Sequence, residues 1–164
     1  MTMTYTTLAW KRNALYLLDQ TKLPRRHVVL ACRDAASVFR AIRALSVRGA
    51  PAIGVAGGFG LYLAVRGARG KREFFRTLER AVSYLRRARP TAVNLEWALG
   101  RMRRHALSCR QADLPQLKSQ LLGEAKAILL EEKERCERMA RFGAALIRSG
   151  DTILTHCNTG ALAT

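Results

Sequence analysis

Short apolar runs separated by polar turns dominate the first thirty residues of the chain. Residues 6–10 and 14–18 are apolar runs on either side of the polar residues 11–13, and a third run covers 27–32. Two runs joined by a short polar turn predict a β-hairpin, and the third run predicts another strand. We therefore expect a small antiparallel β-sheet near the start of the chain.

After this region the apolar positions recur every three or four residues, which is the spacing of one helix face. Such stripes are formed by Val38, Ile42 and Leu45, by Phe74, Leu78, Val82 and Leu85, and along residues 93–106 and 117–147. Asp34 precedes the first stripe and is a residue type that caps helices. The pattern predicts a mostly helical domain.

One predicted helix differs from the others because residues 49–65 are uncharged and rich in small side chains. Pro51 suits its first turn, and its interior contains Gly54, Gly57, Gly58 and Gly60. Each glycine costs about 1 kcal/mol of helix propensity. That cost is expected where helix backbones approach closely, so this helix is predicted to be central and buried. The stretch is too short and too interrupted to predict a membrane span.

The last fifteen residues have a different pattern. A turn at Gly150-Asp151 precedes the mostly apolar residues 152–154, which predict a strand leading to Cys157. Ligands bind at the carboxyl ends of strands in open α/β sheets, which favours a catalytic thiol. A free cysteine is also a common packing residue, and the residues alone leave both interpretations open. We expect a helical domain over 1–148 and the start of a separate α/β domain over 149–164.

The chain is strongly basic, with 29 Lys and Arg against 12 Asp and Glu and a formal net charge of +17. Arginines cluster at 66–72, 86–89 and 101–105. Clustered positive charge favours phosphate binding, but no known nucleic-acid module and no interleaved aromatic residues accompany it. We therefore expect a solvated arginine-rich surface, weak attraction to polyanions at low salt, and no specific nucleic-acid binding.

The four cysteines, Cys32, Cys109, Cys136 and Cys157, are far apart and form no CxxC pair. This spacing argues against a zinc site and against a secreted disulfide framework. Residues 1–13 lack the apolar core of a signal peptide. These features favour a cytoplasmic location.

Two further segments are candidate anion sites. Arg48-Gly49-Ala50 precedes Pro51, so a forked guanidinium and the amide groups of a helix start are predicted side by side. Arg89 precedes Pro90, and Thr91 can cap the helix that follows. Taken alone, the first segment is more typical of an ordinary turn, and Arg89 is equally consistent with a surface arginine in a loop.

Residues 47–54, 89–95 and 155–164 together resemble the signature blocks of methylthioribose-1-phosphate isomerase, in the same order and at similar separations. Residues 10–24 are similar to the N-terminal hairpin of that family. The resemblance covers the whole chain but only about the first half of the family's usual length. It implies a helical domain with a small sheet, joined to a Rossmann-like α/β domain that is truncated here.

The resemblance also implies a function. The family converts the sugar phosphate 5-methylthioribose 1-phosphate into 5-methylthioribulose 1-phosphate in methionine salvage, as a homodimer, without a metal or cofactor. Arg48, Gly49, Ala50 and Arg89 match its substrate-binding positions, and Cys157 matches its catalytic cysteine. The family's partner aspartate lies beyond residue 164, so we expect the chain alone to be inactive. Ribose-1,5-bisphosphate isomerases and regulatory subunits of the translation-initiation exchange factor are the alternatives.

Overall fold

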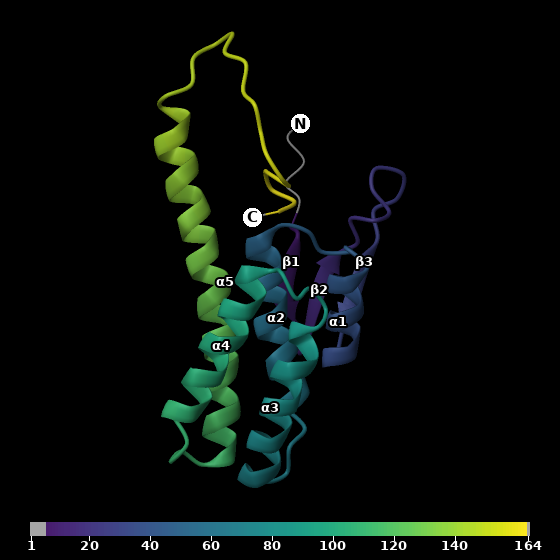
Figure 1. Ribbon diagram of the computed structural model, residues 1–164, viewed down its shortest axis with the longest axis vertical. Helices are drawn as coiled ribbons and strands as arrows, with labels where there is room; N and C mark the ends of the chain where they lie inside the picture. Colours follow the sequence, from purple (N-terminus) through teal and green to yellow (C-terminus); the bar gives the residue numbers. More distant parts are fainter. Residues whose placement is uncertain (1–5, 164) are drawn as a thin grey trace.

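The computed structural model describes residues 6–163, which form a small sheet and a helical bundle (Figure 1). The strands are β1 (Leu8–Lys11), β2 (Ala14–Leu18) and β3 (Val29–Cys32), and the helices are α1 (Ala35–Arg43), α2 (Ala50–Val65), α3 (Lys71–Arg86), α4 (Val93–Ser108) and α5 (Leu114–Ala144). The prediction of a mostly helical domain with a small antiparallel sheet is confirmed.

The sheet has the order β1-β2-β3, with both pairs antiparallel. Arg12 and Asn13 form the hairpin turn with φ values of 48° and 55°. A two-residue turn with positive φ at both positions matches the right-handed twist of the two strands that it joins. Trp10 of β1 stacks on Phe59 of α2 with ring centroids 5.0 Å apart, so the sheet packs against the helical bundle.

Helix α2 is the centre of the fold. Twelve of its sixteen residues are buried, and it contacts each of the other four helices and β2. A Cβ atom at Gly54 would lie only 2.8 Å from the carbonyl oxygen of Asn94, in the first turn of α4. The prediction of a central, buried helix whose glycines permit close backbone approach is confirmed. Within residues 6–163, no helix combines the length and apolar character needed to cross a membrane.

The sequence predicted N-terminal caps for two helices, and the structure contains one of them. Asp34 caps α1 as predicted, since its carboxylate accepts a hydrogen bond of 2.6 Å from the Ser37 amide. The predicted cap at Thr91 is wrong, because Ala92 is the N-cap of α4 and no side chain caps that helix. The Ala92 amide donates to the Arg89 carbonyl at 3.0 Å, and this tight turn leaves Thr91 one position outside the helix.

The long helix α5 extends beyond the bundle, and the chain then returns toward the sheet (Figure 1). Residues 152–154, predicted as a strand, have no regular structure, and Leu154 is 98% exposed. A strand needs a neighbour for its backbone hydrogen bonds, and the sheet of the described residues contains only β1 to β3. The boundary between 1–148 and 149–164 stays a prediction.

The glycines of α2 provide a test of the packing argument. We expect Gly54→Ala to lower the free energy of unfolding by about 1–3 kcal/mol, because the new Cβ would overlap backbone atoms of α4. Gly58→Ala is the matched control in the same helix, since its nearest neighbours would lie at 3.6 Å or more. We expect the control to be neutral or stabilising by up to about 1 kcal/mol. Urea unfolding followed by circular dichroism measures both, and equal effects would contradict the close-packing argument.

Candidate active site

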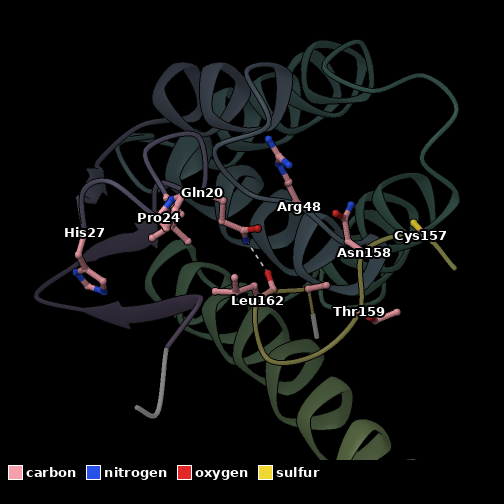
Figure 2. A pocket seen from close by; sticks show the side chains of 10 residues that line it. Gln20, Pro24, His27, Arg48, Cys157, Asn158, Thr159 and Leu162 are labelled. Atoms are coloured by element: carbon pink, nitrogen blue, oxygen red, sulfur yellow. Dashed lines mark hydrogen bonds between the residues drawn. The ribbon is translucent and has the colours of Figure 1, made fainter. Parts of the chain in front are cut away.

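The last described residues fold back onto the start of α2 and the sheet. The Gln20 side-chain amide donates a hydrogen bond of 2.6 Å to the Leu162 carbonyl, and the Thr7 hydroxyl donates to the Ala161 carbonyl. Figure 2 shows the Gln20 contact beside the loop that carries Cys157. Side chains near the first strands thus hold the end of the chain in place.

Gly49 is the point of closest approach between this segment and the bundle. It is the N-cap of α2, with φ of 86°, and a Cβ atom there would lie 2.2 Å from the Ala163 carbonyl oxygen. Both the backbone conformation and the lack of space exclude a side chain. Glycine at this position therefore lets residues 157–163 lie directly against the start of α2.

The folded-back segment closes one side of an open cleft of about 1040 Å³. The cleft is lined by Gln20, Leu23, Pro24, His27, Arg48, Cys157, Asn158, Thr159, Leu162 and Ala163. Its size is at the upper end of the range for small-molecule pockets. The cleft brings together Arg48 and Cys157, two predicted site residues from opposite halves of the chain (Figure 2).

Arg48 is half-buried and directly precedes Gly49. Its Nε donates a hydrogen bond of 3.3 Å to the Leu45 carbonyl, and within residues 6–163 its two terminal nitrogens have no protein partner. One side of the guanidinium is thus fixed and the other is available to a ligand. Oxygen atoms of a phosphate fit such a forked donor.

The start of α2 adds a second set of donors. No side chain caps this helix, and Ala50 at its first position is exposed. The first amides of an uncapped helix lack internal partners and carry partial positive charge, which favours an anion. Gly49 and Ala50 are therefore placed beside Arg48, although neither lines the cleft wall.

Cys157 lies on the opposite side of the cleft from the sheet. Its side chain is exposed, and its φ of 63° turns the chain so that Asn158 and Thr159 follow it along the cleft. A left-handed conformation is uncommon for a residue with a side chain and marks a specific local geometry. The thiol is thus exposed and lines the same cleft as Arg48.

Arg89 is the predicted site residue that the cleft does not include. It lies half-buried in the turn between α3 and α4. The contact between Gly54 and Asn94 places the first turns of α2 and α4 side by side, so Arg89 is at the same end of the bundle. It is nevertheless absent from the residues that line the cleft.

Sequence reasoning missed several residues of the cleft, including Gln20, Pro24 and His27 from the segment between β2 and β3. Gln20 and Pro24 belong to the region similar to the isomerase hairpin, but nothing in their spacing indicated a role. Within residues 6–163, no three His, Cys, Asp or Glu side chains are grouped so that they could hold a metal ion.

Asp19, next to Gln20, fixes the start of this segment. Its side chain is only 5% exposed and accepts hydrogen bonds of 3.1 Å from the Thr21 amide and 2.7 Å from the Thr21 hydroxyl. Burial alone would raise the pKa of this carboxyl, but hydrogen bonds from Thr21 and Ser46 outweigh burial, and its pKa lies below the ordinary value of 3.8. The ionised form therefore stabilises this wall of the cleft.

Comparison with known proteins gives a consistent result. A model of the initiation factor 2 subunit family matches residues 46–164. A curated relative named methylthioribose-1-phosphate isomerase, from Geotalea uraniireducens, is 46% identical over 99% of this chain and 47% of its own length. A relative from Moorella thermoacetica named 5-deoxyribose 1-phosphate isomerase is 43% identical over 96% of this chain and 45% of its own length. The chain spans about half the length of the curated relatives it matches.

Two solved structures share the fold. A 5-methylthioribose 1-phosphate isomerase from Pyrococcus horikoshii gives a TM-score of 0.90 at 39% identity, over 97% of this chain and 45% of its own. A structure titled translation initiation factor eIF-2B, subunit delta, from A. fulgidus gives 0.86 at 38% identity, over 97% and 46%. Because both structures match this fold almost equally well, the fold alone does not separate an enzyme from a binding subunit.

The role of Asp19 leads to a pH prediction. We expect Asp19→Asn to lower the free energy of unfolding at neutral pH by about 1.5 kcal/mol, because charged hydrogen bonds to Thr21 are lost. A lowered folded pKa means that this stability is present above pH 3.8 and is lost as pH falls through the folded pKa. Urea unfolding over a pH series should therefore show the difference between variant and parent shrinking in acid. Glu137→Gln, at an exposed position, is the control.

The close contact at Gly49 leads to a second prediction. Gly49→Ala should displace residues 157–163, since the new methyl group would overlap Ala163. The NMR signal of the Gln20 side-chain amide reports its bond to Leu162 and should move toward the position of a solvated amide. Gly67→Ala is the control, because nothing lies within 4 Å of its added Cβ. An unchanged Gln20 signal in Gly49→Ala would contradict the contact.

Proposed function

Because the chain belongs to the initiation factor 2 subunit family, which includes the methylthioribose-1-phosphate isomerases, we propose that it supplies the N-terminal share of such an isomerase. The observation that carries the proposal is the cleft shared by Arg48 and Cys157 at the start of α2. A binding subunit needs neither an arginine with free terminal nitrogens nor an accessible thiol facing the same cavity.

In this proposal the sugar phosphate binds through its anionic group. Arg48 and the amides at Gly49 and Ala50 receive the phosphate, which offers more acceptor oxygens than one guanidinium can use. Arg89, at the same end of the bundle, binds the remaining phosphate oxygen or a sugar hydroxyl. Fixing the phosphate on C1 places the reacting carbons toward Cys157, and such positioning accounts for a large part of catalysis.

The isomerisation needs no outside reactant. The bond between C1 and the ring oxygen breaks, the hydrogen on C2 moves to C1, and the proton of the C2 hydroxyl ends on the former ring oxygen. Because the phosphate blocks a free aldehyde at C1, ring opening requires an acid at the ring oxygen. We assign Cys157 as one of the two groups that carry protons, facing an acid on the opposite side of the sugar.

That acid and the outer wall of the pocket belong to the second half of the relatives' length. Residues 152–154 then pair with further strands as the first strand of a Rossmann-like α/β domain, which would shield the open cleft from water. The active enzyme is a homodimer in this proposal. The chain by itself contributes phosphate binding and the thiol but does not turn over substrate.

The substrate among the family's sugar phosphates is set by the group on C5. With the C1 phosphate at the start of α2, the C5 substituent faces the side of the cleft lined by Leu23, Pro24 and Leu162. Apolar side chains favour a methylthio group over a second phosphate, because a phosphate would need cationic partners there. This supports 5-methylthioribose 1-phosphate over ribose 1,5-bisphosphate.

The test joins this chain to the portion of the Geotalea uraniireducens relative that follows the matched region. We expect the joined protein to convert 5-methylthioribose 1-phosphate to the ketose, and the chain alone to be inactive. Cys157→Ser should lower kcat by about 100-fold or more, as expected for loss of a proton-transfer group. Arg48→Gln should act mainly on KM, raising it about 10-fold or more. Direct NMR detection of the ketose product measures each rate.

Cys136→Ser is the matched control, because that thiol lies in α5 outside the cleft, and its rate should equal that of the parent. If Cys157→Ser keeps full turnover in a folded protein, the thiol has no catalytic role. The joined protein is also assayed with 5-deoxyribose 1-phosphate and ribose 1,5-bisphosphate. If it folds and dimerises but converts neither these nor 5-methylthioribose 1-phosphate, the chain is a binding subunit and not an isomerase.

A further inference from the structure

The end of the bundle opposite the cleft carries a second concentration of positive charge. There the turn between α2 and α3 lies beside the turn between α4 and α5 (Figure 1), and Lys118 of α5 donates a hydrogen bond of 2.6 Å to the Ala68 carbonyl. We define the distal basic end as Arg69, Lys71, Arg72, Arg110 and Lys118, of which the first four are exposed. These residues come from the start of α3 and the turn before it, from the turn after α4, and from the first part of α5.

Several arginines elsewhere in the bundle are paired with carboxylates, whereas among the described residues the cations of this end are not. On the flanks of α3, α4 and α5, ion pairs form between Arg86 and Glu96, Arg101 and both Glu124 and Glu131, and Arg103 and Glu79. Within residues 6–163, no side chain of the distal basic end forms an ion pair.

The acidic residues nearest this end are already occupied by backbone groups. The Glu73 carboxylate accepts a hydrogen bond of 2.8 Å from the Arg69 amide, and Asp113 caps α5 by accepting one of 2.8 Å from Gln116. Helices α3 and α5 both begin here, so their dipoles add positive potential to the side-chain charges. The five cations of the distal basic end nevertheless outnumber Glu73 and Asp113, so this end keeps a net positive charge.

The surface between the start of α3 and the end of α4 is hollowed by a cleft of about 630 Å³. It is lined by Lys71, Arg72, Phe75, Glu79, Leu107, Arg110 and Gln111. Glu79, its one carboxylate, is held by Arg103 at 2.7 Å. The lining thus combines three cations with one aromatic ring and one aliphatic side chain.

We propose that the distal basic end binds the phosphodiester backbone of RNA without sequence preference. A groove lined by cations and an aromatic ring matches the way proteins hold single strands, by charge along the backbone and stacking of bases. A membrane surface fits less well, because binding there requires apolar side chains that project outward. Phe75 and Leu107 line a hollow, and Leu107 alone, 37% exposed, is too little apolar surface for membrane binding.

The four exposed cations set the expected salt dependence. Each phosphate contact contributes about −0.7 to the slope of log affinity against log salt concentration for single strands. Four contacts therefore predict a slope of about −3, which is about a 60-fold loss of affinity for a fourfold rise in salt. This slope distinguishes a local site from attraction by the whole surface, which would follow the net charge of +17.

Fluorescence anisotropy with labelled oligouridylate of about a dozen nucleotides tests the proposal. The triple variant Lys71→Gln, Arg72→Gln, Arg110→Gln should reduce the slope to about −1 and lower affinity at low salt at least about 10-fold. The control is the triple variant Arg138→Gln, Arg141→Gln, Arg148→Gln, which removes the same number of positive charges from exposed positions outside the distal basic end. The control should bind RNA like the parent, and circular dichroism verifies that both variants are folded.

Three outcomes would overturn the proposal. Equal losses in the two triple variants would mean that net charge alone attracts RNA. Sedimentation with vesicles of anionic phospholipid, without binding to oligouridylate, would assign the surface to a membrane. Absence of any RNA binding by the folded parent at low salt would mean that the charges serve only solvation. None of these results depends on whether the chain supports isomerase activity, because the readout is binding at the end remote from Cys157.

Discussion

The absence of a side chain at Gly49 is the constraint on which the proposed site depends. With φ of 86° and Ala163 in direct contact, this residue lets the end of the described chain lie against the start of α2. The hydrogen bonds from Gln20 and Thr7 then fix the loop that carries Cys157. The same residue is the N-cap of α2, so one position determines both where the helix begins and how closely the thiol approaches it.

The packing of the bundle holds the start of α2, including Gly49, in place. Helix α2 is buried along most of its length and is held by every other helix. Arg101 of α4 binds Glu124 and Glu131 of α5, and this network raises the pKa of the arginine and lowers that of Glu131. These ion pairs anchor the first part of α5 to α4.

The features that could be predicted from the sequence are those that depend on residues close together along the chain. The hairpin, the Asp34 cap and the buried glycine helix all follow from local patterns, and the structure confirms them. Local patterns could not supply contacts between distant segments, so Gln20 and His27 were missed. They also could not show that 152–154 lacks a partner strand or that the tight turn after Arg89 leaves Thr91 outside α4.

The direction of the helices gives the two ends of the bundle a related character. Helices α2 and α4 begin at the cleft, whereas α3 and α5 begin at the opposite end (Figure 1). Each end therefore presents two helix starts with their positive potential, and at the distal end Asp113 caps one of them. In the proposed active site, Arg48 and the folded-back residues 157–163 limit this positive potential to a site for one small anion. In the proposed RNA site, several cations without ion pairs extend the positive potential along a groove. An extended anion fits such a groove better than a small one does.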